Sequence, residues 1–535
     1  MRIRFIKITL LTLLFAGQLA AQTISDANRY FYSDQFDKAV MAFEKLSKAA
    51  PADLNLQLQY GKALVAVNKN KEAVALYQQI ATANPDDTYG QMAAARMLVL
   101  EGKEADAKKM MDKSTRKKTK DAALQRAAAE SFMYSDKSNY NIALEYLTKS
   151  QEASTKDPAT YMAFGDAYYE LNEGGKAASN YEFAGDFDKT IAYPYYKVAK
   201  IYKRSKNNQF FISNLEKALS RNDKFSMVYR ILGDFYYENA KYDKSKENYK
   251  KYLDLESGTF DDKLYYANLL YLTKDYQNTI SYITDLQKQD DSKSYLYRLL
   301  GRSYYELGDS VKGLTAMTTF FDKTTPDKIL ASDYEYYAKL LLKNDKQADA
   351  ITAFEKSIEL DSTGENKKYY TDIAEMFFKQ KNYADAAKYY NMKIGSMKNP
   401  SAQEYYELGI SHYYDKNYAD AEKAFSKVAE LRPEAMTGHL WRAKTATKLE
   451  PDIEADPATI GSYGVAKPYY EKVAELAATD KEKYKKELID ASNYLSYYFY
   501  KKGDNESAKV FLLKTLEVDS TDQYASQLYK LLTGG

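Results

Sequence analysis

The chain has 535 residues, among them 54 tyrosines and no cysteine, and its 77 basic and 75 acidic side chains give a formal net charge of +2. A chain of this length exceeds what one compact core supports, so it predicts several domains or an array of repeats. Only 10 prolines and 22 glycines accompany many helix-forming residues, which favours helix over sheet. The balanced charge excludes a general attraction to nucleic acid, and the lack of cysteine excludes disulfides, thiolate metal sites and a cysteine nucleophile.

The first 21 residues have the pattern of a secretory signal. Basic residues at positions 2, 4 and 7 precede an apolar stretch at 8–16, and small residues follow as far as Ala21. This apolar stretch is too short to span a bilayer, so we expect cleavage after Ala21, with an uncleaved anchor as the alternative. Cleavage would change the formal net charge from +2 to −1. Because a lipid anchor at the mature terminus needs cysteine, we expect a periplasmic protein that is soluble or held at the outer membrane by a partner.

A unit of 34 residues recurs through the rest of the chain. Small residues stand 34 positions apart at Gly165, Ala199, Gly233, Ala267 and Gly301, and an aromatic or aliphatic residue follows each of them three positions later. Further characteristic residues follow at +12 and +16, and the register extends over about fourteen units between residues 24 and 521. The sequence divides into N-terminal repeats (22–130), a tyrosine-rich array (131–435) and C-terminal repeats (436–521), before a closing helix and tail at 522–535.

One unit shows why the pattern predicts paired helices. Tyr229, Leu232, Gly233 and Tyr236 lie on one stripe of a helix with 3.6 residues per turn. The small residue allows a second helix, expected at 243–255, to approach closely. Such a pair cannot bury its apolar faces alone, so pairs are expected to stack into a continuous solenoid.

Residues 406–433 (YELGISHYYDKNYADAEKAFSKVAELRP) carry the pattern most fully, with Leu-Gly, then Ala, then an aromatic residue and Pro at set intervals. This pattern resembles the tetratricopeptide repeat. The resemblance implies an all-α, right-handed α-solenoid whose first helices line a concave groove. It also implies a binding scaffold and not an enzyme, with peptide segments or helices of other proteins as partners.

The sequence contains twelve Tyr-Tyr doublets, and the repeat register assigns different roles to the two rings of a doublet at positions +3 and +4. We expect the +3 ring, such as Tyr236, to be buried in the stack, and the +4 ring, such as Tyr237, to face the groove with residues −3 and +1. Phe235, at +2, is expected to contact the preceding unit. Tyrosine and arginine are enriched at binding hot spots. The predicted groove residues are Tyr169, Lys203, Arg230, Tyr237, Tyr271, Arg298, Arg302, Tyr305, Phe378, Tyr406 and Tyr413. The alternative is that neighbouring first helices bury these rings against each other.

Signs of catalysis are few. The two histidines are His412, expected at a core position, and His439 in a first helix, and no phosphate-binding or nucleophile motif accompanies them. We therefore expect no catalytic residue, metal or cofactor. An insertion at 449–464 is expected to be a solvated loop, or else a partner contact, and it lacks the spacing of a calcium loop. The first functional hypothesis is a scaffold for outer-membrane assembly or secretion. A carbohydrate-capture module and an enzyme subunit without its own chemistry remain alternatives.

Overall fold

The structure, a computed structural model, describes residues 24–534. The predicted signal at 1–21 lies outside the described residues. Across residues 24–534 every regular element is a helix and no strand occurs, so the predicted all-α class is confirmed. None of these helices is long and apolar enough to cross a membrane.

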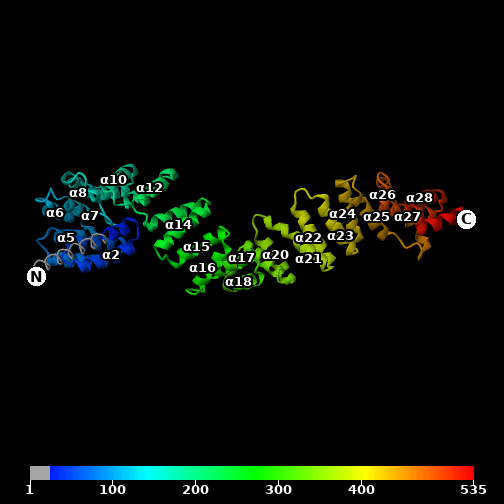
Figure 1. The fold of residues 1–535 in the computed structure, drawn as a ribbon, viewed down its shortest axis with the longest axis horizontal. Coiled ribbons are helices and arrows are strands. Elements are labelled where there is room, and N and C mark those ends of the chain that lie inside the picture. The colour runs from blue at the N-terminus through cyan, green and yellow to red at the C-terminus, as the bar shows by residue number, and fades with distance from the viewer. Residues whose placement is uncertain (1–23, 535) are drawn as a thin grey trace, which may run out of the picture. The chain divides into compact units, whose positions relative to one another are not determined.

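The chain forms two compact units, unit 1 (Met1–Asp275) and unit 2 (Tyr276–Gly535). In both units, helices that follow one another in sequence contact each other and alternate as first and second helices of repeats (Figure 1). The described residues contain fourteen helices of each kind, which confirms the predicted number of repeats. The predicted division at residues 130 and 435 stays a prediction.

In unit 1 the first helices are residues 24–32, α3 (Leu54–Ala66), α5 (Thr88–Leu100), α7 (Ala122–Glu130), α9 (Pro158–Glu170), α11 (Tyr193–Arg204), α13 (Ser226–Glu238) and α15 (Phe260–Leu272). The second helices are α2 (Phe36–Ala49), α4 (Asn70–Ala83), α6 (Glu104–Thr115), α8 (Tyr140–Ala153), α10 (Gly174–Phe187), α12 (Asn208–Arg221) and α14 (Tyr242–Leu255).

In unit 2 the first helices are α17 (Ser294–Glu306), α19 (Ala331–Leu342), α21 (Tyr369–Lys379), α23 (Ala402–Tyr414), α25 (Met436–Leu449) and α27 (Lys485–Lys501). The second helices are α16 (Tyr276–Gln287), α18 (Ser310–Lys323), α20 (Gln347–Leu360), α22 (Tyr383–Ser396), α24 (Tyr418–Leu431), α26 (Lys467–Ala477) and α28 (Asn505–Val518). The closing helix is α29 (Gln523–Thr533), and the short 3₁₀ helices are η1 (Pro326–Lys328), η2 (Glu365–Lys368) and η3 (Pro457–Ser462).

The two helices of a repeat approach closely because the small residue of the first helix faces a large side chain sixteen positions later. A Cβ added to Gly165 would lie 2.4 Å from the ring of Tyr181, and one added to Gly233 would lie 2.6 Å from the ring of Tyr249. The same relation joins Gly409 to Phe425. These contacts confirm the role that the sequence predicts for the small residue.

Short turns join the two helices of most repeats. In the turn after α13, Ala240 adopts φ = 55°, and its N–H and that of Lys241 bond to the last carbonyl groups of the helix. This left-handed residue ends the first helix and reverses the chain, and Asn68, Asn172 and Lys274 adopt the same conformation in the equivalent turns.

The first repeat of unit 1 also contacts helices far along the chain. The ring of Tyr32 stacks on that of Tyr193 in α11, with 4.8 Å between centroids. Asp34, in the first turn, accepts hydrogen bonds from Tyr196 Oη (3.2 Å) and Lys200 Nζ (2.5 Å), both in α11. Contacts between the first and sixth repeats are therefore part of the fold of unit 1.

Candidate partner-binding surfaces

The Tyr-Tyr doublet of α13 is divided less sharply than predicted. Tyr236 and Tyr237 are both half-buried, whereas Phe235 is only 7 % exposed and contacts Phe211 of the preceding repeat at 5.2 Å between centroids. The prediction for Phe235 is thus confirmed, and Tyr236 packs against the core cluster as predicted but stays half-buried. Its position in the last turn of α13 explains the difference, because few neighbours cover a ring there.

Tyr237 lies against the next repeat. Its ring is 5.0 Å from Tyr265 of α15 and 5.5 Å from Tyr242 at the start of α14. Tyr305 of α17 has an equivalent contact with Tyr336 of α19, at 5.3 Å between centroids. These two predicted groove rings therefore contribute to the stacking of successive first helices, as the alternative interpretation expects.

The predicted groove arginines bind buried aspartates of the next first helix. Arg298 and Arg302 each place a guanidinium nitrogen 2.7 Å from a carboxylate oxygen of Asp333, whose side chain is fully buried. Arg230 lies 3.4 Å from Asp262 in the same arrangement, although 40 % of its side chain is exposed. Sequence reasoning missed these pairs. The available signal was an aspartate in the first turn of the following first helix, 31 to 35 residues downstream.

The remaining predicted groove residues of unit 1 have different surroundings. Lys203 is exposed, with its Nζ 5.9 Å from the ring centroid of Phe211, and Tyr271 is half-buried. Tyr169 lines a cavity of about 320 Å³ in unit 1 together with Asp34 and Tyr134. Asp166, Lys197 and Lys200 also line it.

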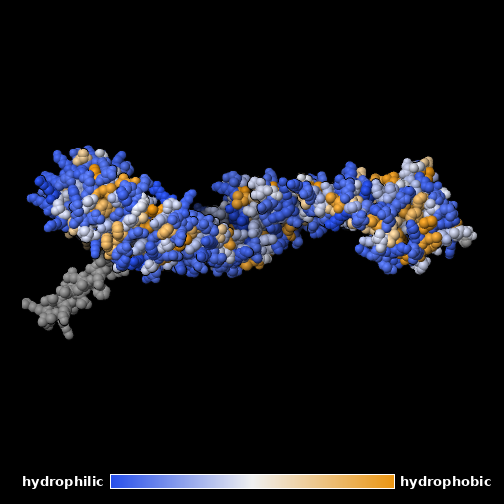
Figure 2. Space-filling model, turned by 90° about the horizontal axis from the view of Figure 1, so that it is seen from above, coloured by the Kyte–Doolittle hydropathy of each residue, from blue (hydrophilic) through white to orange (hydrophobic). Residues whose placement is uncertain are grey.

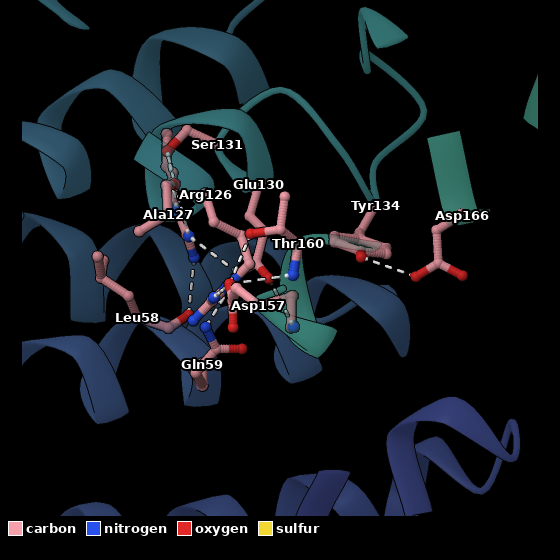
Figure 3. Close-up of polar contacts among 12 residues, drawn as sticks. Leu58, Gln59, Arg126, Ala127, Glu130, Ser131, Tyr134, Asp157, Thr160 and Asp166 are labelled. Carbon is pink, nitrogen blue, oxygen red and sulfur yellow. Dashed lines mark hydrogen bonds and ion pairs between the residues drawn. The ribbon is translucent and has the colours of Figure 1, made fainter. Parts of the chain in front are cut away.

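A buried cluster of charged residues lies between α3, α5, α7 and α9 (Figure 3). Glu130 accepts a hydrogen bond from Gln59 Nε2 at 2.9 Å, and its carboxylate lies 3.7 Å from Lys62 and 4.0 Å from Arg96. Burial alone would raise the pKa of Glu130, but Lys62, Arg126 and Arg96 outweigh it and hold that pKa below its usual value. The carboxylate of Glu130 is therefore ionised, and the surrounding basic side chains balance its negative charge inside unit 1.

Tyrosine hydroxyls extend this polar network toward the cavity. Tyr134 Oη donates to Asp166 at 2.9 Å, as Figure 3 shows, and Tyr181 Oη donates to the other carboxylate oxygen at 2.7 Å. Burial and the nearby Asp166 raise the pKa of both tyrosines well above 10, so both hydroxyls keep their protons and act as donors. The network satisfies its own groups and holds the repeats of unit 1 together.

Unit 2 carries a different surface, in which aromatic rings of three repeats form a continuous series. We call it the Trp441 surface, and it consists of Phe378, Tyr383, Tyr406, Tyr413, Tyr414, Tyr418 and Trp441. Tyr383 stacks on Tyr414 at 5.3 Å between centroids, and Tyr413 lies 5.8 Å from Tyr414 and 5.2 Å from Trp441. Three of the predicted groove residues, Phe378, Tyr406 and Tyr413, are thus brought together here.

The rings of the Trp441 surface are accessible to solvent. Tyr414 is 49 % exposed, and the other six rings are half-buried. Lys444 places its Nζ 5.3 Å from the centroid of the Trp441 ring. The molecular face in Figure 2 is mostly hydrophilic, with apolar groups between the hydrophilic ones.

The insertion at 449–464 is solvent-exposed at residues 454–458, as predicted, but it is not a free loop. It contains η3 and lies against α27, where Glu450 Oε1 accepts a hydrogen bond from Tyr494 Oη at 2.5 Å. Ile453 within it is only 8 % exposed. The insertion carries apolar and tyrosine side chains among its acidic residues, and this explains why it packs on the helix.

The histidines do not form a catalytic arrangement with other groups. His412 is half-buried, with burial lowering its pKa, and His439 Nε2 lies 2.8 Å from the carbonyl oxygen of Pro433. Within the part of the chain that the structure describes, no group of three or more His, Asp or Glu side chains is placed to hold a metal ion.

Comparison with known proteins gives matches in sequence and in structure. Family models described as tetratricopeptide repeat match residues 30–97, 338–396 and 406–450. The C-terminal part of a TPR repeat-containing protein from Cytophaga hutchinsonii is 31 % identical over 50 % of this chain and 99 % of that chain, with a TM-score of 0.34. A tetratricopeptide repeat protein from Parabacteroides merdae is 16 % identical over 46 % of this chain and 96 % of its own, with a TM-score of 0.28. MamA from Desulfovibrio magneticus is 17 % identical over 32 % of this chain and 97 % of its own, also with a TM-score of 0.28. No curated protein matches the chain.

Proposed function

Because the chain belongs to the tetratricopeptide repeat family, we propose that it is a non-enzymatic scaffold that binds extended segments or helices of other proteins. The observation that carries this proposal is the Trp441 surface. Aromatic rings offer a large contact area at a low cost in conformational entropy, and tryptophan and tyrosine dominate the residues that contribute most to protein binding. Rings that already contact one another are also held in place before a partner arrives.

We further propose that the scaffold acts in the periplasm of a Gram-negative cell, in the assembly or secretion of outer-membrane proteins. This part of the proposal depends on the signal pattern at 1–21 and on the absence of cysteine from the chain. Fractionation of the producing cells and N-terminal sequencing test it. We expect the mature protein in the periplasmic fraction with Gln22 as its first residue, and an intact Met1 in the cytoplasm would contradict the location.

Photo-crosslinking tests the binding surface. A photoreactive phenylalanine analogue placed at Tyr414 should capture an envelope protein in living cells. The same analogue placed at Phe183 in unit 1, which is also 49 % exposed, is the matched control. Captured proteins are identified by mass spectrometry.

A second substitution decides whether the captured protein is a specific partner. Trp441→Ala should reduce the crosslinking at position 414 at least tenfold, because truncation of a central aromatic residue costs about 2 kcal/mol or more of binding free energy. Equal capture at positions 414 and 183, or capture that Trp441→Ala leaves unchanged, would show that this surface does not bind the partner.

A further inference from the structure

The insertion between α25 and α26 occupies the surface of another repeat. Its residue Tyr463 lies among three rings of α27, with centroids 6.3 Å from Tyr494, 6.1 Å from Tyr497 and 6.2 Å from Tyr498. Lys502 Nζ donates to the carbonyl oxygen of Ile460 at 2.5 Å. A segment of fifteen residues, 450–464, thus lies on α27 through ring contacts and a hydrogen bond from the Lys502 side chain to its backbone.

Two carboxylates of this segment bind to the tyrosines and a lysine of α27. Glu450 Oε1 accepts from Tyr494 Oη at 2.5 Å, and Glu454 accepts from Tyr497 Oη and from Lys501 Nζ, the latter at 2.6 Å. The stretch 450–456 has four acidic residues and no basic residue. Its charge therefore complements the lysines at the C-terminal end of α27.

The same kind of carboxylate site occurs independently in unit 1. There Asp34 accepts from Tyr196 Oη at 3.2 Å and from Lys200 Nζ at 2.5 Å. Tyr196 and Lys200 are four residues apart on α11, as Tyr497 and Lys501 are on α27, so in both helices the two side chains lie on one face. Two unrelated segments of the chain thus present a carboxylate to a Tyr-x-x-x-Lys pair on the first helix of a repeat.

The contact between the insertion and α27 is suited to exchange. The side chain of Glu454 is 64 % exposed, and exposed ion pairs contribute at most about 1 kcal/mol. Glu450 Oε1 also accepts hydrogen bonds from the backbone N–H groups of Gly464 (3.1 Å) and Ala466 (2.8 Å), whereas Glu450 Oε2 is buried without a hydrogen-bond partner. Most other repeats join their two helices through about three residues, which shows that a repeat closes without such an insertion.

We propose that the face of α27 formed by Tyr494, Tyr497 and Lys501 is a docking site for an extended acidic segment of a partner protein, and that residues 450–464 occupy this site as an internal substitute until the partner displaces them. The inference rests on the proposed scaffold function and specifies the chemistry of one partner segment. That segment carries carboxylates about four residues apart, to match Glu450 and Glu454, together with an aromatic residue that takes the place of Tyr463.

A synthetic peptide of residues 450–464 serves as the probe. In a variant of the full chain, residues 450–465 are replaced by the three-residue turn Asp415–Asn417, which joins α23 to α24. Fluorescence anisotropy of the labelled peptide should show saturable binding to this variant and at least tenfold weaker binding to the intact chain, where the internal segment competes. Circular dichroism and thermal melting establish that the variant is folded.

Matched changes test the contacts themselves. Lys501→Ala in the variant should weaken peptide binding about fivefold, whereas Lys485→Ala, at an exposed position on the same helix, should leave it unchanged. A peptide with Glu450→Gln and Glu454→Gln should also bind at least tenfold more weakly. A folded variant that does not bind the peptide, or binding that is insensitive to Lys501, would overturn the inference.

A second measurement covers the case in which the shortened variant does not fold. In the intact chain, Glu450→Gln with Glu454→Gln should release the segment, increase hydrogen exchange at 450–464 and raise affinity for the unmodified peptide at least tenfold. Unchanged exchange and unchanged affinity would overturn the inference as well. Neither result bears on crosslinking at the Trp441 surface, so the proposed function can stand or fail separately.

Discussion

Replacement of Glu130 by glutamine is the sharpest test of how unit 1 is held together. Glutamine keeps the size of the side chain and its hydrogen-bonding ability but removes the negative charge. The side chains of Lys62 and Arg96 beside it are 3 % and 4 % exposed, so neither cation would gain access to water. The substitution therefore leaves two buried cations without their shared counter-charge.

The size of the effect follows from the distances. At 3.7 Å and 4.0 Å, each pair contributes about 4 kcal/mol of gross attraction in a medium with an effective dielectric constant of about 20. The cost of removing these charges from water offsets much of this attraction. Removal of one partner from a buried ion pair commonly costs about 3–5 kcal/mol. We expect Glu130→Gln to lower the free energy of unfolding of unit 1 by that amount.

Urea unfolding followed by circular dichroism measures the loss, and hydrogen exchange in α3 and α7 assigns the transition to unit 1. Glu145→Gln is the control, because the Glu145 side chain is 55 % exposed and pairs with Lys108 at the surface; its effect should stay below about 0.5 kcal/mol. The double variant with Lys62→Met should recover at least half of the loss. A Glu130→Gln effect no larger than that of Glu145→Gln would refute the electrostatic account.

Four further outcomes follow from features of single residues. Asp333→Asn should lower the free energy of unfolding of unit 2 by about 3 kcal/mol in urea, because a fully buried carboxylate that binds two arginines is lost. Ala240→Gly should raise the melting temperature, since glycine relieves about 1 kcal/mol of strain at φ = 55°. Burial alone would raise the pKa of Asp262, but hydrogen bonds from Thr259 and the charge of Arg230 lower it. The stability it provides is therefore complete above about pH 4 and lost as the pH falls through the lowered pKa, and Asp262→Asn should reduce this acid dependence. Tyr236→Ala and Tyr237→Ala should each cost about 2 kcal/mol because both rings are half-buried, and a clear inequality between them would contradict this interpretation.

The repeat was predictable because its cause is local. The spacing from Gly233 to Tyr249 records how closely two consecutive helices must approach, and both residues lie within one unit of the sequence. The second helix expected at 243–255 starts one residue after the start of α14 and ends at the same residue as α14. The helix period and the spacing of small residues in the sequence thus determine how the two helices of a repeat pack.

The surfaces were harder to predict, since they depend on which repeats meet. The repeat register predicts Arg298 as a groove residue, but its counter-charge Asp333 belongs to the next repeat, which the pattern within one unit does not reveal. The ring series around Trp441 combines residues of three repeats, and its tryptophan was not among the predicted groove residues. The insertion looked solvated because its acidic residues are conspicuous, whereas its contacts with α27 depend on a helix that begins twenty-one residues after Gly464.

The contact of the first turn with α11 determines the order in which unit 1 is able to fold. Asp34 and its partners are separated by 162 and 166 residues, so this contact closes a long loop of chain. Repeat arrays held only by neighbours start folding at any point and propagate. In unit 1, by contrast, the first repeat emerges first during synthesis but gains its last tertiary contacts only after α11 is complete. Unit 1 should therefore fold slowly and as one cooperative block, and a chain truncated before Tyr193 should lose protection first at its intact N-terminal end.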